Sequence, residues 1–146
     1  MFGVRNSIIL KKKILFLCTG NSCRSQIAEG LAREAGWQAF SAGTQPETGV
    51  NPLVFQVMVE IGIDISKHQP KSVDEFLKED FTLVSTVCDN ARESCPIFSG
   101  KCEYIIHYGF IDPAIAAGNN EEKLEVFRNV RDKIGGWIKE ISREYL

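Results

Sequence analysis

The sequence predicts an α/β fold in three layers, with a mainly parallel four-stranded sheet and helices on both of its faces. Short apolar runs alternate along the chain with segments whose apolar residues recur every three or four positions. That alternation is typical of parallel strands joined by helices. A long amphipathic pattern over residues 121–145 predicts a final helix that packs on the sheet.

Four segments are expected to form the strands, at residues 12–17, 37–41, 81–87 and 104–106. The first is a continuous apolar run, which is typical of a strand buried on both faces. The first and third strands each lead directly into a cysteine, Cys18 and Cys88. Functional loops of such folds lie at the carboxyl ends of the strands, so both thiols are expected at one edge of the sheet.

The first helix is expected over residues 24–36, with Gly36 as its end. In that segment Ile27, Leu31 and Ala35 recur four residues apart, which predicts one apolar stripe along the helix.

The second helix is expected to begin at Asn51, because this residue before Pro52 is typical of an N-cap followed by proline in the first turn. Gly62 is expected to end that helix. Residues 72–78 predict a further short helical turn.

Composition bounds the class of protein. The 146 residues, 44% hydrophobic and 25% charged, predict a single globular domain over 1–146, in which residues 1–11 form an N-terminal extension. A net charge of −2 predicts no nucleic-acid or membrane partner. The first ten residues do not have the pattern of a signal peptide, so a cytoplasmic location is expected. There, the five cysteines would be mostly reduced thiols.

The loop from Cys18 to Ser25 carries the strongest functional signal. Its five small or polar residues between Cys18 and Arg24 can curl so that their amides point inward at a helix N-terminus, where they bind a tetrahedral oxyanion. Gly20 and Asn21 tolerate the left-handed backbone that such a curl needs. The predicted oxyanion-binding residues are Thr19, Gly20, Asn21, Ser22, Cys23 and Arg24.

Cys18 is the predicted nucleophile of this loop. The amides, the helix dipole and the Arg24 guanidinium all favour its thiolate, which would lie beneath the bound oxyanion for in-line attack. A lone cysteine at the end of a buried strand is more often a small core residue, but here strand, loop, arginine and helix coincide. Cys23 is expected to point into the core from the first helical turn.

Cys88 and Cys95 form a second candidate pair. If both lie on one short helix, seven residues separate their Cα atoms by roughly 10 Å, whereas a disulfide needs about 4.4–6.8 Å. The pair would then bond only if the segment unwinds, as in a redox switch. The alternative is two unrelated buried thiols. A zinc site is less consistent with the spacing, since zinc ligands usually come as closer pairs.

Asp112 precedes Pro113 and is therefore expected on an extended loop. A carboxyl group there is a candidate general acid that protonates an oxygen leaving the oxyanion. Asp-Pro is also a common turn dipeptide, and this alternative stays open. His68 and His107 are interpreted as hydrogen-bonded scaffold residues.

At residues 18–26 the chain resembles the active-site loop of thioredoxin-coupled arsenate reductases, which share their fold with low-molecular-weight protein tyrosine phosphatases. The resemblance runs from Lys12 through nearly the whole chain. It includes residues 40–43, 49–52, 63–66, 87–88, 95–96 and 107–114.

The resemblance implies a cascade of three thiols in arsenic detoxification, with a redox disulfide between Cys88 and Cys95. Cys18 attacks arsenate, Ser25 hydrogen-bonds the Cys18 thiolate, and Asp112 protonates the departing oxygen. Cys88 then attacks Cys18, and arsenite leaves. Cys95 attacks Cys88, and a thioredoxin-like protein reduces the resulting disulfide. The implied ligand is arsenate or phosphate, no cofactor or metal is expected, and the protein is expected to be a monomer.

The chain departs from the family pattern near the loop. Some relatives bind potassium through residues that match Asn21, Glu29 and Ser41 and through an aspartate, in whose place this chain has Lys71. We therefore expect no potassium site, with the Lys71 ammonium beside Glu29.

Two other functions compete with arsenate reduction. A phosphatase of the same fold would hydrolyse phosphate monoesters through a Cys18 phosphoenzyme, and residual phosphatase activity is expected in any case. However, the residues after Pro113 are Ala-Ile-Ala-Ala, without the tyrosines that flank an aromatic substrate in those phosphatases. A non-catalytic thiol redox sensor would use Cys88 and Cys95 without turnover.

Overall fold

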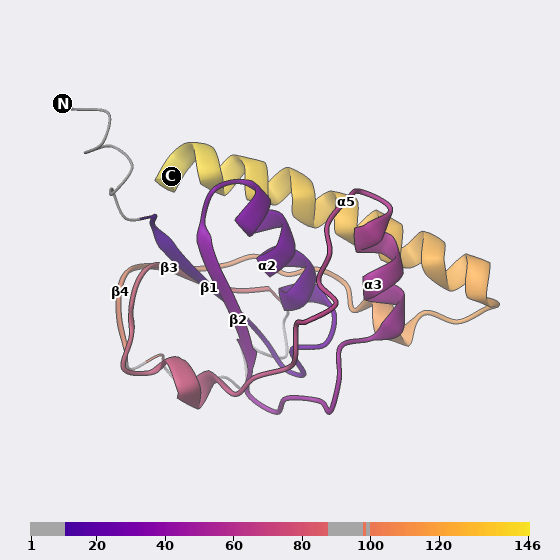
Figure 1. Cartoon of the computed structure of the whole chain (residues 1–146), viewed down its shortest axis with the longest axis horizontal. Helices are drawn as coiled ribbons and strands as arrows, with labels where there is room; N and C mark the ends of the chain where they lie inside the picture. Colours follow the sequence, from indigo (N-terminus) through magenta and orange to yellow (C-terminus); the bar gives the residue numbers. More distant parts are fainter. Residues whose placement is uncertain (1–10, 88–97, 99) are drawn as a thin grey trace.

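The computed structural model describes residues 11–87, 98 and 100–146, and it confirms the α/β class (Figure 1). The described strands are β1 (Lys13–Cys18), β2 (Gln38–Gly43), β3 (Asp80–Thr86) and β4 (Lys101–His107). The described helices are α2 (Arg24–Glu34), α3 (Pro52–Val59) and α5 (Asn120–Tyr145), with short 3-10 helices η1 (Val73–Phe76) and η2 (Pro113–Ile115). None of these helices combines the length and apolar character that crossing a bilayer requires.

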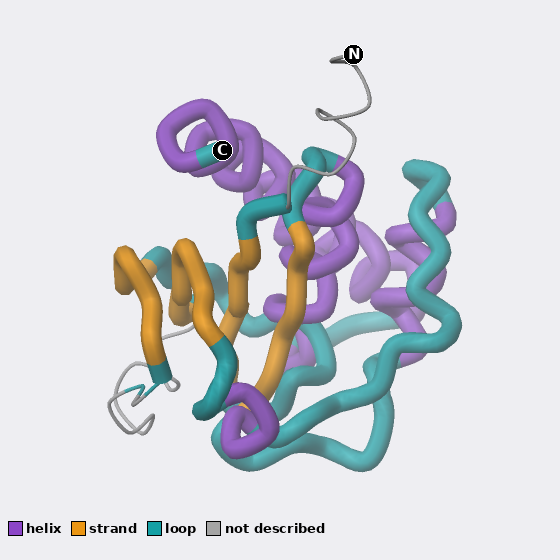
Figure 2. The backbone as a smooth tube through the Cα atoms, turned by 60° about the vertical axis from the view of Figure 1, so that its left-hand side comes forward, coloured by secondary structure: helices purple, strands orange, loops and turns teal. Residues whose placement is uncertain are grey.

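The sheet has the strand order β2-β1-β3-β4, and every neighbouring pair is parallel. Leu17 of β1 lies opposite Ala42 of β2 and Thr86 of β3. With Thr86 opposite His107 of β4, the four strands end at nearly the same level of the sheet, which is the layer drawn in orange in Figure 2. This register brings the loops after β1, β2, β3 and β4 to one edge of the sheet, as predicted.

The central strand β1 is buried on both faces of the sheet, and its successive side chains point to opposite sides. Ile14 and Phe16 belong to the larger core, which they share with α2, α3 and α5. Leu15 and Leu17 belong to the smaller core, which η1 covers. Four phenylalanine rings pack edge-to-face or tilted on that second side, at Phe40, Phe76, Phe81 and Phe98.

Helix α2 is buried on more than one side, which corrects the expected single stripe. Ile27 is fully buried, but Leu31 is only partly buried and Ala35 is exposed. The helix packs against the sheet, α3 and α5 together, so polar side chains of its first two turns are buried as well. Gly36 follows the helix with a φ of +107°, in agreement with its predicted role as a terminator.

The predicted start of α3 is confirmed, since the Asn51 side chain accepts a hydrogen bond from the Leu53 amide (2.9 Å). The helix ends at Val59 and therefore before Gly62, the residue that was expected to end it. Strand β4 and helix α5 both start earlier than expected. Asn119 and Glu122 cap α5 reciprocally, a capping box that the sequence analysis missed.

Helix α3 is joined to α5 by charge as well as by packing. Glu60, which follows α3, accepts hydrogen bonds from Arg128 (2.8 Å) and Arg131 (2.8 Å) of α5. The Arg131 guanidinium also donates to the Val57 carbonyl (2.8 Å). The hydrogen bonds from Arg128 and Arg131 lower the pKa of Glu60 from 4.5 to about 2.

We predict that Glu60→Gln lowers the Tm, and that its deficit relative to wild type depends on pH. Because the pKa of Glu60 is lower in the folded state, its contribution is complete above the unfolded pKa of 4.5 and is lost as the pH falls toward about 2. Thermal unfolding across this range should show the two Tm values converging. The control is Glu125→Gln, which removes an ion pair with Arg128 within α5 only. A Glu60→Gln deficit that is unchanged between pH 7 and pH 3 would contradict the assignment.

Candidate functional site

The loop that follows β1 is held by its carbonyl groups. The Thr19 and Gly20 carbonyls accept hydrogen bonds from the Gln45 and Glu47 amides, both 2.9 Å. The next two carbonyls, of Asn21 and Ser22, accept from the Gln26 side chain (3.0 Å) and the Asn51 amide (3.0 Å).

These anchors determine where the loop amides point. In a trans peptide the N–H lies opposite the C=O of the preceding residue. The four carbonyls face the surrounding scaffold, so the amides of residues 20–23 are turned away from it. The predicted binding of an oxyanion by these amides requires this orientation, and the binding itself stays a prediction.

Asn21 supplies the left-handed residue of the loop, with a φ of +52°. Gly20 was expected to share this role, but no positive φ is found there. Asn21 is stabilised by its own side chain, whose Oδ1 accepts from the Lys71 amide (2.9 Å). Its Nδ2 donates to the hydroxyls of Ser25 (2.7 Å) and Ser41 (2.9 Å). Because the Lys71 N–H can only donate, the atom of the Asn21 side-chain amide that it contacts must be the oxygen.

Gly43 allows the loop to lie against the end of β2. A Cβ at this position would meet the Thr19 carbonyl oxygen at 2.5 Å, so a larger residue would push the loop outward. The close approach therefore depends on glycine at this strand end.

Cys18 lies at the base of the loop and is only 2% exposed. Its Sγ is 2.8 Å from the Ser25 Oγ. Because the Ser25 oxygen already accepts from Asn21, its own proton is available to donate to the sulfur. A donated hydrogen bond stabilises the thiolate, which is the form that attacks.

Cys23, the other described thiol in the loop, has different properties. It occupies the N-cap position of α2, is 4% exposed and belongs to the larger core, as expected. Burial raises its pKa to about 11, so it stays a protonated thiol at neutral pH. Of the two thiols, Cys18 therefore stays the predicted nucleophile.

Arg24 connects the loop to the segment after β4. Its Nη1 donates to the Phe110 carbonyl (3.0 Å), and its Nη2 lies 3.7 Å from the Asp112 carboxylate. The Arg24 Nε is buried and has no acceptor among the described residues. A bound oxyanion would provide that acceptor, which fits the predicted role of Arg24.

Asp112 faces the same cleft as Cys18. One carboxylate oxygen caps η2 by accepting from the Ala114 amide (2.9 Å), and the other faces Arg24. The structure therefore shows both predicted features of Asp112, a turn residue and a carboxyl group at the oxyanion loop. The cleft that Cys18, Arg24 and Asp112 line has a volume of about 210 Å³, a size suited to a small anion.

Sequence reasoning missed two residues of the cleft. Gln45 and Glu47 line it from the loop after β2, beside the oxyanion loop. Their place in the chain could have identified them, because both follow a strand that ends at the same sheet edge as β1.

A buried carboxylate lies beneath the loop. Glu29 is 1% exposed, accepts from the Ser41 hydroxyl (2.6 Å) and pairs with the Arg33 guanidinium (2.7 Å). The expectation that Lys71 would be the partner is wrong, since its ammonium donates to the Gln69 carbonyl (3.1 Å). Arg33 follows Glu29 by four residues and thus lies on the same side of α2.

His68 is a scaffold residue, as predicted. Its Nδ1 donates to the Gln26 side-chain oxygen (3.0 Å), and burial lowers its pKa. His68 therefore positions the Gln26 side chain, which donates to the Asn21 carbonyl of the oxyanion loop. Among the described residues, no group of three or more His, Cys, Asp or Glu side chains is arranged to hold a metal ion.

Cys88 and Cys95 lie outside the described residues. The chain approaches them through Val87, whose amide donates to the Leu17 carbonyl (2.9 Å). Cys18 directly follows Leu17, and Cys88 directly follows Val87. Val87, the last described residue before Cys88, thus lies beside the end of β1.

Comparisons with known proteins agree with this geometry. Residues 13–145 match the family model of low molecular weight phosphotyrosine protein phosphatases. An arsenate reductase from Halalkalibacterium halodurans is 48% identical over 88% of this chain and 94% of its own length. The arsenate reductase of Bacillus subtilis is 43% identical over 90% of this chain and 95% of its own.

Solved structures are similar over nearly the whole fold. An arsenate reductase in a phosphate-binding state has a TM-score of 0.78 and 30% identity, and covers 92% of this chain and 99% of its own. An arsenate reductase in an oxidized state has a TM-score of 0.77 and 28% identity over the same shares.

We predict that stability does not depend on potassium, because the Arg33 guanidinium already neutralises Glu29. Wild type should have the same Tm in potassium and sodium chloride at equal ionic strength. Arg33→Gln should lower the free energy of unfolding by about 1–3 kcal/mol, less than for a fully buried pair because Arg33 is half exposed. The control, Lys71→Gln, should unfold like wild type. A higher wild-type Tm in potassium would overturn the prediction.

Proposed function

The chain belongs to the low molecular weight phosphotyrosine protein phosphatase family and, within it, to the arsenate reductases, and we propose that it reduces arsenate to arsenite through a cascade of three thiols, two of which end as a disulfide. The observation that carries this proposal is the Cys18 thiol, 2.8 Å from the Ser25 hydroxyl at the base of a cleft lined by Arg24 and Asp112. In arsenic detoxification the arsenite formed would then leave the enzyme.

The first step forms a bond between sulfur and arsenic. The amides of the loop and the Arg24 guanidinium bind arsenate, as the buried Arg24 Nε supports, because it has no acceptor in the described part of the chain. The Cys18 thiolate attacks arsenic, and one arsenate oxygen leaves as water after protonation by Asp112. The position of Asp112, with one carboxylate oxygen 3.7 Å from the Arg24 Nη2, supports this role.

The second step transfers two electrons. The Cys88 thiolate attacks the Cys18 sulfur, a Cys18–Cys88 disulfide forms, and the pair of electrons from the sulfur–arsenic bond remains on arsenic. Arsenic is thereby reduced from the +5 to the +3 state and leaves as arsenite. Leu17 and Val87, which precede Cys18 and Cys88, are hydrogen-bonded to each other, and this supports the attack.

The third step restores Cys18. The Cys95 thiolate attacks Cys88, which releases the Cys18 thiolate and leaves a Cys88–Cys95 disulfide. Overall, arsenate and two thiols give arsenite, a disulfide and water. A thioredoxin-like dithiol protein then reduces the disulfide and is itself oxidised.

Hydrolysis of phosphate monoesters is the second candidate function. Phosphate has the same tetrahedral shape as arsenate, so a slow phosphatase activity through Cys18 is expected. The cleft favours a small anion over an aromatic ester, since it is bordered after Pro113 by Ala114 and not by an aromatic ring. A sensor without turnover would still need Cys88 and Cys95 but not the cleft.

We predict that Cys18→Ser, Cys88→Ser and Cys95→Ser each abolish thioredoxin-coupled arsenate turnover. Only Cys18→Ser should also abolish hydrolysis of para-nitrophenyl phosphate, because hydrolysis requires no second thiol. Arsenite release and ester hydrolysis are measured for each variant. Cys102→Ser is the matched control and should keep reductase activity, since Cys102 lies in β4 and does not line the cleft. Multiple turnovers in Cys88→Ser or Cys95→Ser would exclude the cascade.

We further predict that Asp112→Asn lowers the rate of arsenite release in a single turnover by about 10²–10⁴-fold, the usual contribution of a general acid. The amide oxygen can still accept from the Ala114 amide, so η2 and the fold should be preserved. Circular dichroism checks the fold, and rapid quenching measures the rate. Asp74→Asn, a change at the exposed first turn of η1, is the control. A single-turnover rate close to that of wild type would remove Asp112 from the chemistry.

A further inference from the structure

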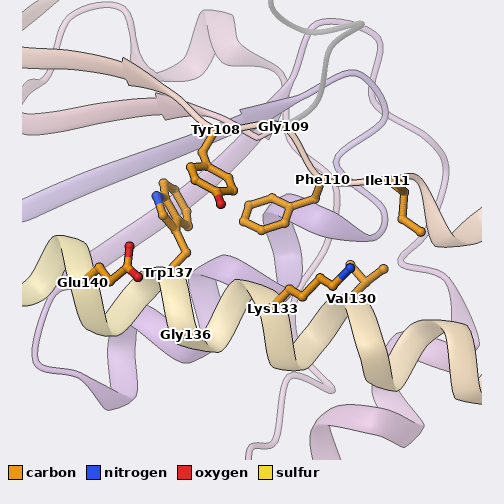
Figure 3. A pocket seen from close by; sticks show the side chains of 9 residues that line it. All are labelled: Tyr108, Gly109, Phe110, Ile111, Val130, Lys133, Gly136, Trp137 and Glu140. Carbon is orange, nitrogen blue, oxygen red and sulfur yellow. The ribbon is translucent and has the colours of Figure 1, made fainter.

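An apolar groove lies between α5 and the segment that follows β4. Figure 3 shows Tyr108 and Phe110 reaching toward the helix, from which Trp137 rises to meet them. The ring centroids of Tyr108 lie 5.0 Å from Phe110 and 5.6 Å from Trp137. The groove has a volume of about 480 Å³, with Lys133 and Glu140 at its border.

Part of this aromatic surface is exposed although it is apolar. Phe110 and Trp137 are 9% and 5% exposed and form the floor. Tyr108 is 49% exposed and Ile111 is 65% exposed, so they form an accessible rim. The groove is separate from the oxyanion cleft, which is lined by polar and charged residues and shares no lining residue with it. Its lining is suited to an apolar protein surface rather than to an anion.

The groove is directly connected to the chain that leads to Cys88. The Tyr108 amide donates to the Thr86 carbonyl (3.0 Å), and the Phe110 amide donates to the Val87 carbonyl (3.1 Å). Val87 is the residue before Cys88. The aromatic segment is therefore hydrogen-bonded to the last described residue ahead of the redox pair.

The same segment also contacts the oxyanion site, because the Phe110 carbonyl accepts from the Arg24 guanidinium (3.0 Å). A protein bound in the groove would thus lie beside Val87, the residue that precedes Cys88. It would not occupy the cleft, whose lining residues are different. This continuity with the proposed chemistry is what identifies the occupant.

We propose that this groove is the docking surface for the dithiol protein that reduces the enzyme, with Tyr108 and Ile111 as its exposed contacts. The inference rests on the proposed function and adds the place where the partner binds. Exchange between thiol and disulfide requires the attacking sulfur to reach the attacked one in line, so the surface around the partner's dithiol must cover the surface next to Cys88. The exposed apolar rim fits a partner whose dithiol lies within an apolar face.

Ile111→Glu tests the proposal, because it places a charge on the rim. We expect the KM for a bacterial thioredoxin, recycled by thioredoxin reductase and NADPH, to rise about tenfold, as for loss of a significant interface contact. Tyr108→Ala should raise the same KM. Val59→Glu is the matched control, since Val59 is 64% exposed on α3 and does not line the groove, and its KM should equal that of wild type.

A reaction that needs no partner separates docking from chemistry. In a single turnover of the pre-reduced enzyme with arsenate, both groove variants should release arsenite at the wild-type rate. A slower single turnover in Ile111→Glu would assign the residue to positioning Asp112 and overturn the docking proposal. An unchanged thioredoxin KM in both variants would overturn it as well.

Two further outcomes distinguish the remaining explanations. If sedimentation shows that wild type is a dimer and that Ile111→Glu is a monomer, the groove binds a second copy of this chain and the proposal is overturned. If wild type releases no arsenite in a single turnover, the proposed function itself fails and the docking proposal falls with it. Wild-type single turnover with unchanged KM values in the variants rejects docking alone.

Discussion

The site depends on the hydrogen bonds that hold the carbonyls of the oxyanion loop against the scaffold. Each of the four bonds comes from a different donor, and the donors lie on the loop after β2, on α2 and at the start of α3. Because peptide units are rigid, anchoring the carbonyls orients the amides without any ligand. The loop amides are therefore preorganised, so little reorganisation is needed when an anion binds. The folded scaffold, rather than the loop alone, forms the anion site.

Charge beneath the loop is balanced by the same architecture. Glu29 would be costly to bury alone, and Arg33 and Ser41 compensate that cost from α2 and β2. Ser41 also accepts from Asn21, the residue in the left-handed conformation. The buried carboxylate, the strand end and the loop conformation thus form one connected polar network, and a change in one member is transmitted to the others.

The parallel sheet places the separate functions next to one another. The proposed nucleophile Cys18 ends β1, the proposed acid Asp112 follows β4, and β3 leads into the segment that contains Cys88 and Cys95. Arg24 joins the loops after β1 and β4 by donating to Phe110 and facing Asp112. The proposed anion site therefore lies at one edge of the sheet, and the aromatic groove that we propose as a docking surface follows β4 at the same edge.

The sequence by itself determined the presence of the four strands, the starts of α2 and α3 and the oxyanion loop, because apolar periodicity, the Asn51–Pro52 cap and the spacing of Cys18 and Arg24 are local signals. The Cys88–Cys95 pair, which lies outside the described residues, remains a prediction. Only the tertiary structure decided that Arg33 rather than Lys71 neutralises Glu29, and that Glu47 lines the cleft. Such contacts depend on which side chains the packed helices and neighbouring strand ends bring within reach, and local sequence patterns do not encode that distance.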